Sequence, residues 1–229
     1  MTAAPGRRAA AGPWAVVLPV RSFGQAKPGL TAQIGGHHAE LAHAFYLDTL
    51  RAVRATPGVG LVVVVTADPL AASQAGILGA VTVAEQPGGA GAEGAAQRGV
   101  DSLAPDTPVA VLVADLPALR PEELHQALTA AGRHRRSFVP DRAGSGTTAL
   151  MARRAAELRP LLGPGSRHRN AAAGAYEIVL PPTGGLRLDV DTRPDLTAAR
   201  ALGMGQYSAA VLSLWATPRQ PRPVAAALL

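Results

Sequence analysis

The sequence predicts a single α/β domain in which helices cover both faces of a mainly parallel, mixed sheet. Apolar strand-like runs alternate with helical patterns along the chain, and several of these runs consist of Val and Leu without polar alternation. Strands that are buried on both faces of a parallel sheet have such uninterrupted apolar sequences. The β-α-β-α order then predicts a three-layer architecture with right-handed crossovers.

Each expected strand is a short apolar run bounded by turn residues. The expected strands are Ala15–Val20, Leu61–Thr66, Ala80–Ala84, Val109–Ala114, Ser137–Pro140, Thr147–Ala152, Tyr176–Leu180 and Leu186–Val190. A helix follows the first strand, because helical spacing brings one set of apolar residues to a common face. That set is Ala39, Ala42, Tyr46, Leu50 and Val53. Further helices are expected at Pro69–Leu78, Glu93–Leu103, Pro121–Arg133 and Pro194–Leu202.

The length of 229 residues and an apolar content of 48% allow one domain with a full core. We expect this domain to span residues 13–205, between a flexible N-terminus at 1–12 and a loosely ordered, Pro- and Ala-rich tail at 206–229. The absence of cysteine excludes a disulfide framework and a thiolate zinc site. No apolar run approaches the roughly 20 residues of a membrane span, and residues 1–12 lack the apolar core of a secretory signal. A cytoplasmic protein without a membrane partner is expected.

The formal net charge of +6 favours anionic partners. Phosphorylated small molecules are favoured over nucleic acid, because the basic residues are scattered and aromatic residues make up only 3% of the chain. Single-stranded nucleic acid is commonly bound by aromatic side chains that stack on the bases, and no such platform lies among the basic residues. We therefore expect no nucleic-acid partner; either a monomer or a homodimer is compatible with the sequence.

Two aspartates end the run Leu186–Thr192. In an extended strand, Asp189 and Asp191 face the same side, and paired carboxylates at a strand end suit a hard cation such as Mg²⁺. Thr192 and Asp195 form a capping-box pattern that starts the next helix. The alternative is a polar strand end with no ligand.

Asp115 follows the apolar run Val109–Ala114 and is predicted to lie at the same edge of the sheet. It would be the third carboxylate of a metal site, although a single Asp at this position can also cap a turn.

The loop after the first strand contains Arg21, Gly24 and Lys27, which could surround a polyphosphate with backbone amides and two cations. It lacks the Gly-Lys-Ser/Thr ending of a Walker A loop. An ordinary solvated loop is the alternative interpretation.

Two turns rich in small residues could also bind an anion. Small residues in Asp141–Thr148 would let an anion approach the backbone, and Leu162–Asn170 offers amides, a hydroxyl and basic side chains. Such segments are more often plain turns.

In their order along the chain, these segments resemble the 2-phospho-L-lactate and phosphoenolpyruvate guanylyltransferases of coenzyme F-420 biosynthesis. The resemblance covers about residues 14–205. The matching segments are Pro19-Val-Arg21 with Ala26-Lys27, Ala114–Leu119, Arg136–Thr147, Gly163–His168 and Leu188–Arg200.

The resemblance implies a Rossmann-like nucleotidyltransferase fold and the condensation of GTP with a phosphorylated C3 acid, releasing pyrophosphate and a diphospho-5′-guanosine adduct. It implies that the acceptor, phosphoenolpyruvate or 2-phospho-L-lactate, is held by Thr147, Gly163 and Ser166. It further implies that Asp115, Asp189 and Asp191 bind one or two Mg²⁺ ions. Arg21 and Lys27 would bind the nucleotide phosphates, and Lys27 and Asp115 would be catalytic.

The chain departs from this family pattern at Gly29 and Glu93, where the family usually has Arg and Asn. Two alternatives therefore stay open. One is another nucleotidyltransferase of the same fold, such as one serving the molybdenum cofactor. The other is a non-catalytic relative that binds nucleotides.

Overall fold

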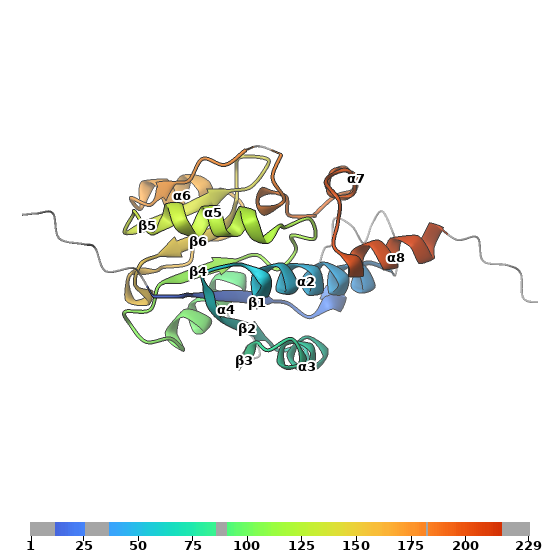
Figure 1. The fold of residues 1–229 in the computed structure, drawn as a ribbon, viewed down its shortest axis with the longest axis horizontal. Helices are drawn as coiled ribbons and strands as arrows, with labels where there is room; N and C mark the ends of the chain where they lie inside the picture. Colours follow the sequence, from blue (N-terminus) through green and yellow to red (C-terminus); the bar gives the residue numbers. More distant parts are fainter. Residues whose placement is uncertain (1–11, 26–36, 86–90, 182, 217–229) are drawn as a thin grey trace, which may run out of the picture.

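The computed structural model describes residues 12–25, 37–85, 91–181 and 183–216, and within these ranges seven strands form one sheet (Figure 1). The strands are β1 (Trp14–Val20), β2 (Val59–Thr66), β3 (Val81–Ala84), β4 (Val109–Leu112), β5 (Arg136–Pro140), β6 (Thr147–Ala152) and β7 (Tyr176–Glu177). Their order across the sheet is β3-β2-β1-β4-β6-β5-β7. β6 runs antiparallel to β4 and β5, and the other neighbouring strands pair in parallel. The expected mainly parallel, mixed sheet is confirmed.

Helices lie on both faces of this sheet (Figure 1). They are α2 (His38–Ala55), α3 (Pro69–Ile77), α4 (Gly91–Asp101), α5 (Pro121–Ala131), α6 (Ser166–Ala172), α7 (Arg193–Leu202) and α8 (Gln206–Ala216), with 3₁₀ turns η1 (Phe23–Gln25), η3 (Ala155–Glu157) and η4 (Gly185–Arg187). None of those described helices is both long and apolar enough to cross a membrane.

Two hydrophobic cores flank the sheet and define the three layers. Val16 and Leu18 of β1 pack with α2, α3 and α5 on one face, whereas Val17 packs with α4 and the segment around η3 on the other. Alternate residues of β1 therefore enter opposite cores, which explains why this strand has no polar alternation. The expected three-layer architecture is confirmed.

The expected strand at Leu186–Val190 is wrong. Gly185–Arg187 forms the 3₁₀ turn η4, and residues 188–190 pair with no strand of the sheet. The Glu123 carboxylate accepts the N–H groups of Gly185 and Leu186, each at 3.0 Å. A side chain thus takes the place that a neighbouring strand would have as hydrogen-bond acceptor. The strand expected at Tyr176–Leu180 is shorter than predicted, since β7 ends at Glu177.

The tail expected to be loosely ordered contains a helix. Residues 206–216 form α8, whose Val211, Leu212 and Trp215 pack in a core cluster with Leu41 and Phe45 of α2. α2 is consequently buried against the sheet on one side and against α8 on the other. Residues 217–229 and most of the expected flexible N-terminus lie outside the described ranges.

The buried carboxylate of Asp48 in α2 holds the first turn of α8. It accepts the N–H groups of Tyr207 at 3.0 Å and Ser208 at 2.8 Å. Burial raises the pKa of Asp48 above its ordinary value of 3.8, and hydrogen bonds from Ser208 and Tyr207, together with the charge of Arg51, oppose part of that rise. The folded protein therefore binds this proton more tightly than the unfolded chain does.

This pKa direction predicts how the stability depends on pH. Between pH 3.8 and the raised pKa, the folded state holds more protons at Asp48 than the unfolded state, so the free energy of unfolding falls as the pH rises. Asp48→Asn cannot titrate, and we expect the stability of the wild type relative to this variant to fall from pH 4 to pH 7. Urea unfolding at several pH values measures this difference, and a difference that grows with pH would contradict the prediction.

Candidate active site

A cleft of ≈ 540 Å³ opens at the sheet edge where the parallel strands end. Its walls come from the loops after β1 and β4, the β5–β6 turn, the loop before α6 and the start of α7. The candidate residues that line it are Arg21, Asp115, Thr147, Gly163, Asp189 and Asp191. The fold thus brings together residues that are as far apart in the sequence as 21 and 191.

Asp115 is held at this edge by the chain on either side of it. The N–H of Leu116 donates to the buried Thr49 hydroxyl at 3.0 Å, and the Asp115 carbonyl accepts the N–H of Val190 at 3.2 Å. The second bond joins the loop after β4 to the segment that carries Asp189 and Asp191.

Asp189 and Asp191 both line the cleft, although their segment is not a strand of the sheet. Leu188 and Val190 are buried in a hydrophobic cluster with Leu41 and Phe45, so the alternation of buried and cleft-lining residues expected from the sequence is preserved. The predicted capping box is confirmed: Asp195 accepts the N–H of Thr192 at 2.9 Å, and the Thr192 hydroxyl accepts the N–H of Asp195 at 3.4 Å.

The segment before Asp189 depends on a close backbone approach. A Cβ atom at Gly185 would overlap the carbonyl group of Ala118, in the loop that follows Asp115. Glu123, at the start of α5, accepts the N–H groups of Gly185 and Leu186 and so holds the same segment. The loop after β4 and the 185–191 segment can therefore lie together only because residue 185 has no side chain.

The turn between β5 and β6 forms another wall of the cleft. Two of its backbone amides donate hydrogen bonds within the turn rather than facing an anion site, as the sequence had suggested. The Asp141 carboxylate accepts the N–H groups of Ser145 at 2.9 Å and Gly146 at 2.8 Å. The expectation that an anion approaches the backbone of this turn is therefore wrong at these two amides, because they already donate to a carboxylate of the same chain.

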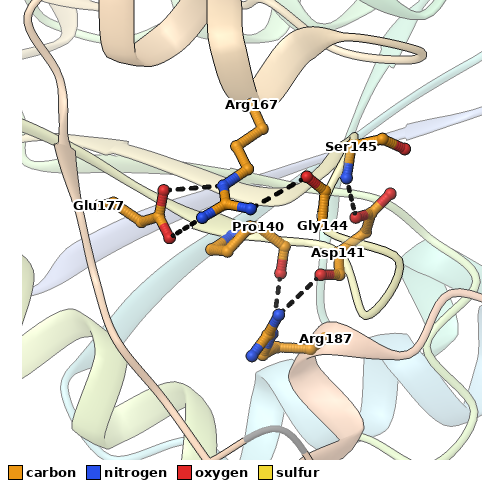
Figure 2. Close-up of polar contacts among 7 residues, drawn as sticks. All are labelled: Pro140, Asp141, Gly144, Ser145, Arg167, Glu177 and Arg187. Atoms are coloured by element: carbon orange, nitrogen blue, oxygen red, sulfur yellow. Dashed lines mark hydrogen bonds and ion pairs between the residues drawn. The ribbon is translucent and has the colours of Figure 1, made fainter.

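Two arginines hold this turn from outside (Figure 2). Arg167 of α6 pairs with both carboxylate oxygens of Glu177 at 2.9 and 2.8 Å, and it also donates to the Gly144 carbonyl at 3.1 Å. Arg187 donates to the carbonyls of Pro140 at 3.2 Å and Asp141 at 2.9 Å. Arg167, which lies in a segment that the sequence suggested could bind an anion, thus holds the wall in place. Its partner Glu177 was not predicted.

The loop before α6 is tied to α4 in a similar way. Glu93 accepts the N–H of Leu162 at 2.9 Å and a guanidinium N–H of Arg169 at 2.9 Å, while Arg169 also donates to the Leu162 carbonyl. Leu162 and Gly163 both line the cleft. Glu93, which departs from the family pattern, therefore holds the loop that carries Gly163.

The other two residues expected to bind the acceptor differ in their access to the cleft. Thr147 lines it, and its hydroxyl oxygen accepts a hydrogen bond from the buried Asn170 at 3.1 Å. Ser166 is fully buried and is absent from the cleft lining. Asn170 was missed because its partner is 23 residues away in the chain.

Arg21 lines the cleft at the end of β1, and the following loop is attached to α3. The N–H of Phe23 donates to the Asp68 carboxylate at 3.3 Å, while the same side chain accepts the N–H groups of Leu70 and Ala71 at the start of α3. Lys27 and Gly29 lie outside the described residues, so the expected phosphate contact of Lys27 stays a prediction.

Tyr46 lines the apolar part of the cleft. Burial and then the charge of Asp68 raise the pKa of its phenol, whose O–H donates to the Ala71 carbonyl at 3.0 Å. Tyr46 therefore stays protonated at neutral pH and contributes to the shape of the cleft rather than acting as a base.

Five aspartates line the cleft, and two of them accept local backbone N–H groups: Asp141 within its turn and Asp195 in the capping box. The three predicted metal ligands, Asp115, Asp189 and Asp191, line the same cleft. Across the described ranges, no three His, Asp or Glu side chains converge closely enough to hold a metal ion by themselves. The donor set nevertheless suits Mg²⁺, because this ion is usually bound by one or two carboxylates together with substrate phosphates.

A family model described as the MobA-like NTP transferase domain matches residues 23–177, and the chain belongs to that family. Two solved structures share the fold. A nucleotidyl transferase from Methanothermobacter thermautotroptrophicus has a TM-score of 0.57 at 17% identity, covering 83% of this chain and 97% of that one. A 4-diphosphocytidyl-2C-methyl-D-erythritol synthase has a TM-score of 0.58 at 15% identity, covering 85% and 99%.

Comparison with curated relatives identifies a narrower family among the nucleotidyltransferases. A phosphoenolpyruvate guanylyltransferase from Streptomyces coelicolor is 46% identical over 203 residues, which cover 86% of this chain and 95% of the relative. Another from Streptomyces scabiei is 44% identical over 214 residues, covering 90% and 99%. The chain therefore belongs to the phosphoenolpyruvate guanylyltransferase family, as its sequence motifs suggested.

The close approach at Gly185 can be tested by substitution. Gly185→Ala should lower the free energy of unfolding by about 1–3 kcal/mol, because the added methyl group displaces the loop after β4. Gly76→Ala is the matched control: nothing lies within 4 Å of a Cβ at this position in α3, and alanine should raise the helix stability by up to about 1 kcal/mol. Urea unfolding of both variants measures the difference. A Gly185→Ala protein as stable as the wild type would show that the two segments are not in contact.

Proposed function

We propose that this protein transfers the guanylyl group of GTP to the phosphate of phosphoenolpyruvate. The observation that carries the proposal is the 46% identity to a phosphoenolpyruvate guanylyltransferase over 86% of the chain. The cleft supports it, because carboxylates and Arg21 line the sheet edge at which open α/β proteins bind nucleotides.

In the proposed reaction, an oxygen of the acceptor phosphate attacks the α-phosphorus of GTP. A new bond forms between that oxygen and the α-phosphorus, and the bond from the α-phosphorus to the oxygen bridging it to the β-phosphorus breaks. Pyrophosphate leaves with the electron pair, and the product is a diphosphate that joins guanosine to the enolpyruvyl group. Such chemistry depends mainly on positioning and on neutralising phosphate charge.

The residues proposed for these tasks come from different walls of the cleft. Arg21, with Lys27, would bind the triphosphate through charge-assisted hydrogen bonds. On the other wall, Thr147 and Gly163 would contact the acceptor. Ser166 is retained as an acceptor residue, but its burial means that it would act from beneath the loop.

Asp115, with Asp189 or Asp191, would hold Mg²⁺. When bound, this ion would neutralise the charge on the nucleotide phosphates. The support is the donor set: three carboxylates from two segments joined by the bond between Val190 and Asp115 line the same cleft.

The proposal predicts the substrate pairing. The purified chain, incubated with Mg²⁺, each common nucleoside triphosphate and either phosphoenolpyruvate or 2-phospho-L-lactate, should release most pyrophosphate from GTP with phosphoenolpyruvate. Phosphate release assays with a pyrophosphatase, and mass spectrometry of the adduct, measure this. Chelation of divalent ions should stop turnover. Absence of pyrophosphate with every pairing would favour a non-catalytic relative, and activity with a different pairing would favour another nucleotidyltransferase.

The proposed metal role predicts that Asp189→Asn and Asp191→Asn each lower kcat by roughly 100-fold or more, because the amide keeps the shape but removes the negative charge. Asp101→Asn is the matched control, since Asp101 is an exposed acid in α4 that accepts only a surface hydrogen bond from Gln97 in the described part of the chain. Steady-state kinetics on variants with wild-type circular dichroism spectra provide the measurement. Full activity of both cleft variants would refute the metal role of this pair.

A further inference from the structure

Thr147 and the loop before α6 form the side of the cleft proposed to hold the acceptor. On this side, the buried side-chain amide of Asn170 donates a hydrogen bond to the Thr147 hydroxyl, which lines the cleft. Asn170 of α6 is 2% exposed, and its side-chain N–H groups donate to the Thr147 hydroxyl oxygen at 3.1 Å and to the Leu161 carbonyl at 3.0 Å. Thr147 is the first residue of β6 and lines the cleft, whereas Asn170 lies behind it.

The Leu161 carbonyl determines which end of the amide faces Thr147. A backbone carbonyl can only accept hydrogen bonds, so the NH₂ group of Asn170, and not its oxygen, must face Leu161 and Thr147. Its two hydrogens are donated to these two residues. The amide is therefore a donor toward Thr147, and the Thr147 oxygen is the acceptor.

A hydroxyl group has one hydrogen to donate and can accept at its oxygen. Because the oxygen of Thr147 accepts from Asn170, its own hydrogen is directed to another group. Within the described ranges, Asn170 is the hydrogen-bond partner found for this hydroxyl, and the cleft is the open space beside it. The arrangement presents an O–H donor to whatever occupies the acceptor end.

We infer that Asn170 is a positioning residue that fixes the Thr147 hydroxyl as a hydrogen-bond donor to an anionic oxygen of the acceptor, a phosphate or carboxylate oxygen. This inference rests on the proposed function. Asn170 does not itself touch the substrate; it acts by orienting Thr147 and by holding Leu161 next to the loop that carries Gly163.

The test uses a double-mutant cycle. Asn170→Asp keeps the size of the side chain but replaces its donors with acceptors, so that the Thr147 hydroxyl would donate to the new carboxylate instead of to substrate. Thr147→Val removes the hydroxyl with little change of shape, and Thr147→Ser keeps it. The new carboxylate also repels the Leu161 carbonyl. This repulsion is the same whether residue 147 is Thr or Val, so comparing Asn170→Asp in the two backgrounds separates it from the effect that passes through the Thr147 hydroxyl.

Pyrophosphate release by the full chain gives KM for phosphoenolpyruvate and for GTP separately. Asn170→Asp and Thr147→Val should each raise KM for phosphoenolpyruvate roughly tenfold, the size of one lost hydrogen bond to a charged group, with KM for GTP unchanged. Thr147→Ser should stay near the wild type. Asn170→Asp should raise KM for phosphoenolpyruvate by a smaller factor in the Thr147→Val background than in the wild type, because only its effect through Leu161 remains there. Ser137→Ala, a buried hydroxyl of β5 outside the cleft, is the control for changes in the core and should leave both KM values unaltered.

Three results would overturn the inference: an unchanged KM for phosphoenolpyruvate in Asn170→Asp, a parallel rise of both KM values, or effects that multiply to about a hundredfold in the double variant. Each of these would leave the proposed function standing, because the wild type would still turn over GTP and phosphoenolpyruvate. A wild type that releases no pyrophosphate from this pair would overturn the proposed function and the inference with it.

Discussion

Carboxylates that accept backbone N–H groups hold together the loops at the cleft edge of this sheet. Glu123 fixes the segment before Asp189, Asp141 closes the β5–β6 turn, Glu93 holds the loop before α6, and Asp68 ties the loop after β1 to α3. Loop amides have no ladder partner, and leaving them unpaired away from water costs free energy. These four segments at the cleft therefore depend on a carboxylate, and in three of the four cases that carboxylate lies in a different element.

The basic residues of α6 serve the same purpose. Arg167 and Arg169 leave α6 in different directions, toward Glu177 and Glu93, and each also donates to a carbonyl of the wall. The net positive charge of the chain is thus a poor guide to anion binding at this place, because these guanidinium groups are already paired. Of the described arginines, Arg21 and Arg142 line the cleft.

Local patterns predicted much of this molecule. The apolar runs located the strands, and the Thr192–Asp195 spacing predicted the start of α7, because strand burial and helix capping depend on residues close in sequence. Asp115, Asp189 and Asp191 were expected at one edge, and all three line the cleft. The sequence also carried the family motifs, which the relatives confirm.

What the sequence did not predict depends on distant partners. The apolar run at 186–190 has the pattern of a strand, but Glu123, about sixty residues earlier, takes its first N–H groups. Likewise α8 is capped by Asp48, 159 positions before Tyr207. The pairing of Arg167 with Glu177 and of Asn170 with Thr147 follows from the way α6 lies against the sheet, which no local spacing encodes.

The antiparallel course of β6 has a consequence for how such a cleft can change shape. In a wholly parallel sheet, the chain leaving β5 at this edge would have to enter a long crossover. Here it turns back at once, and this wall of the cleft is a hairpin connection whose two ends are fixed by the β5–β6 ladder. Residues can be added to or removed from the tip of that hairpin without altering the strand order or the two cores. The loops after β1 and β4 leave the sheet separately from this hairpin, so a change at its tip leaves those loops in place.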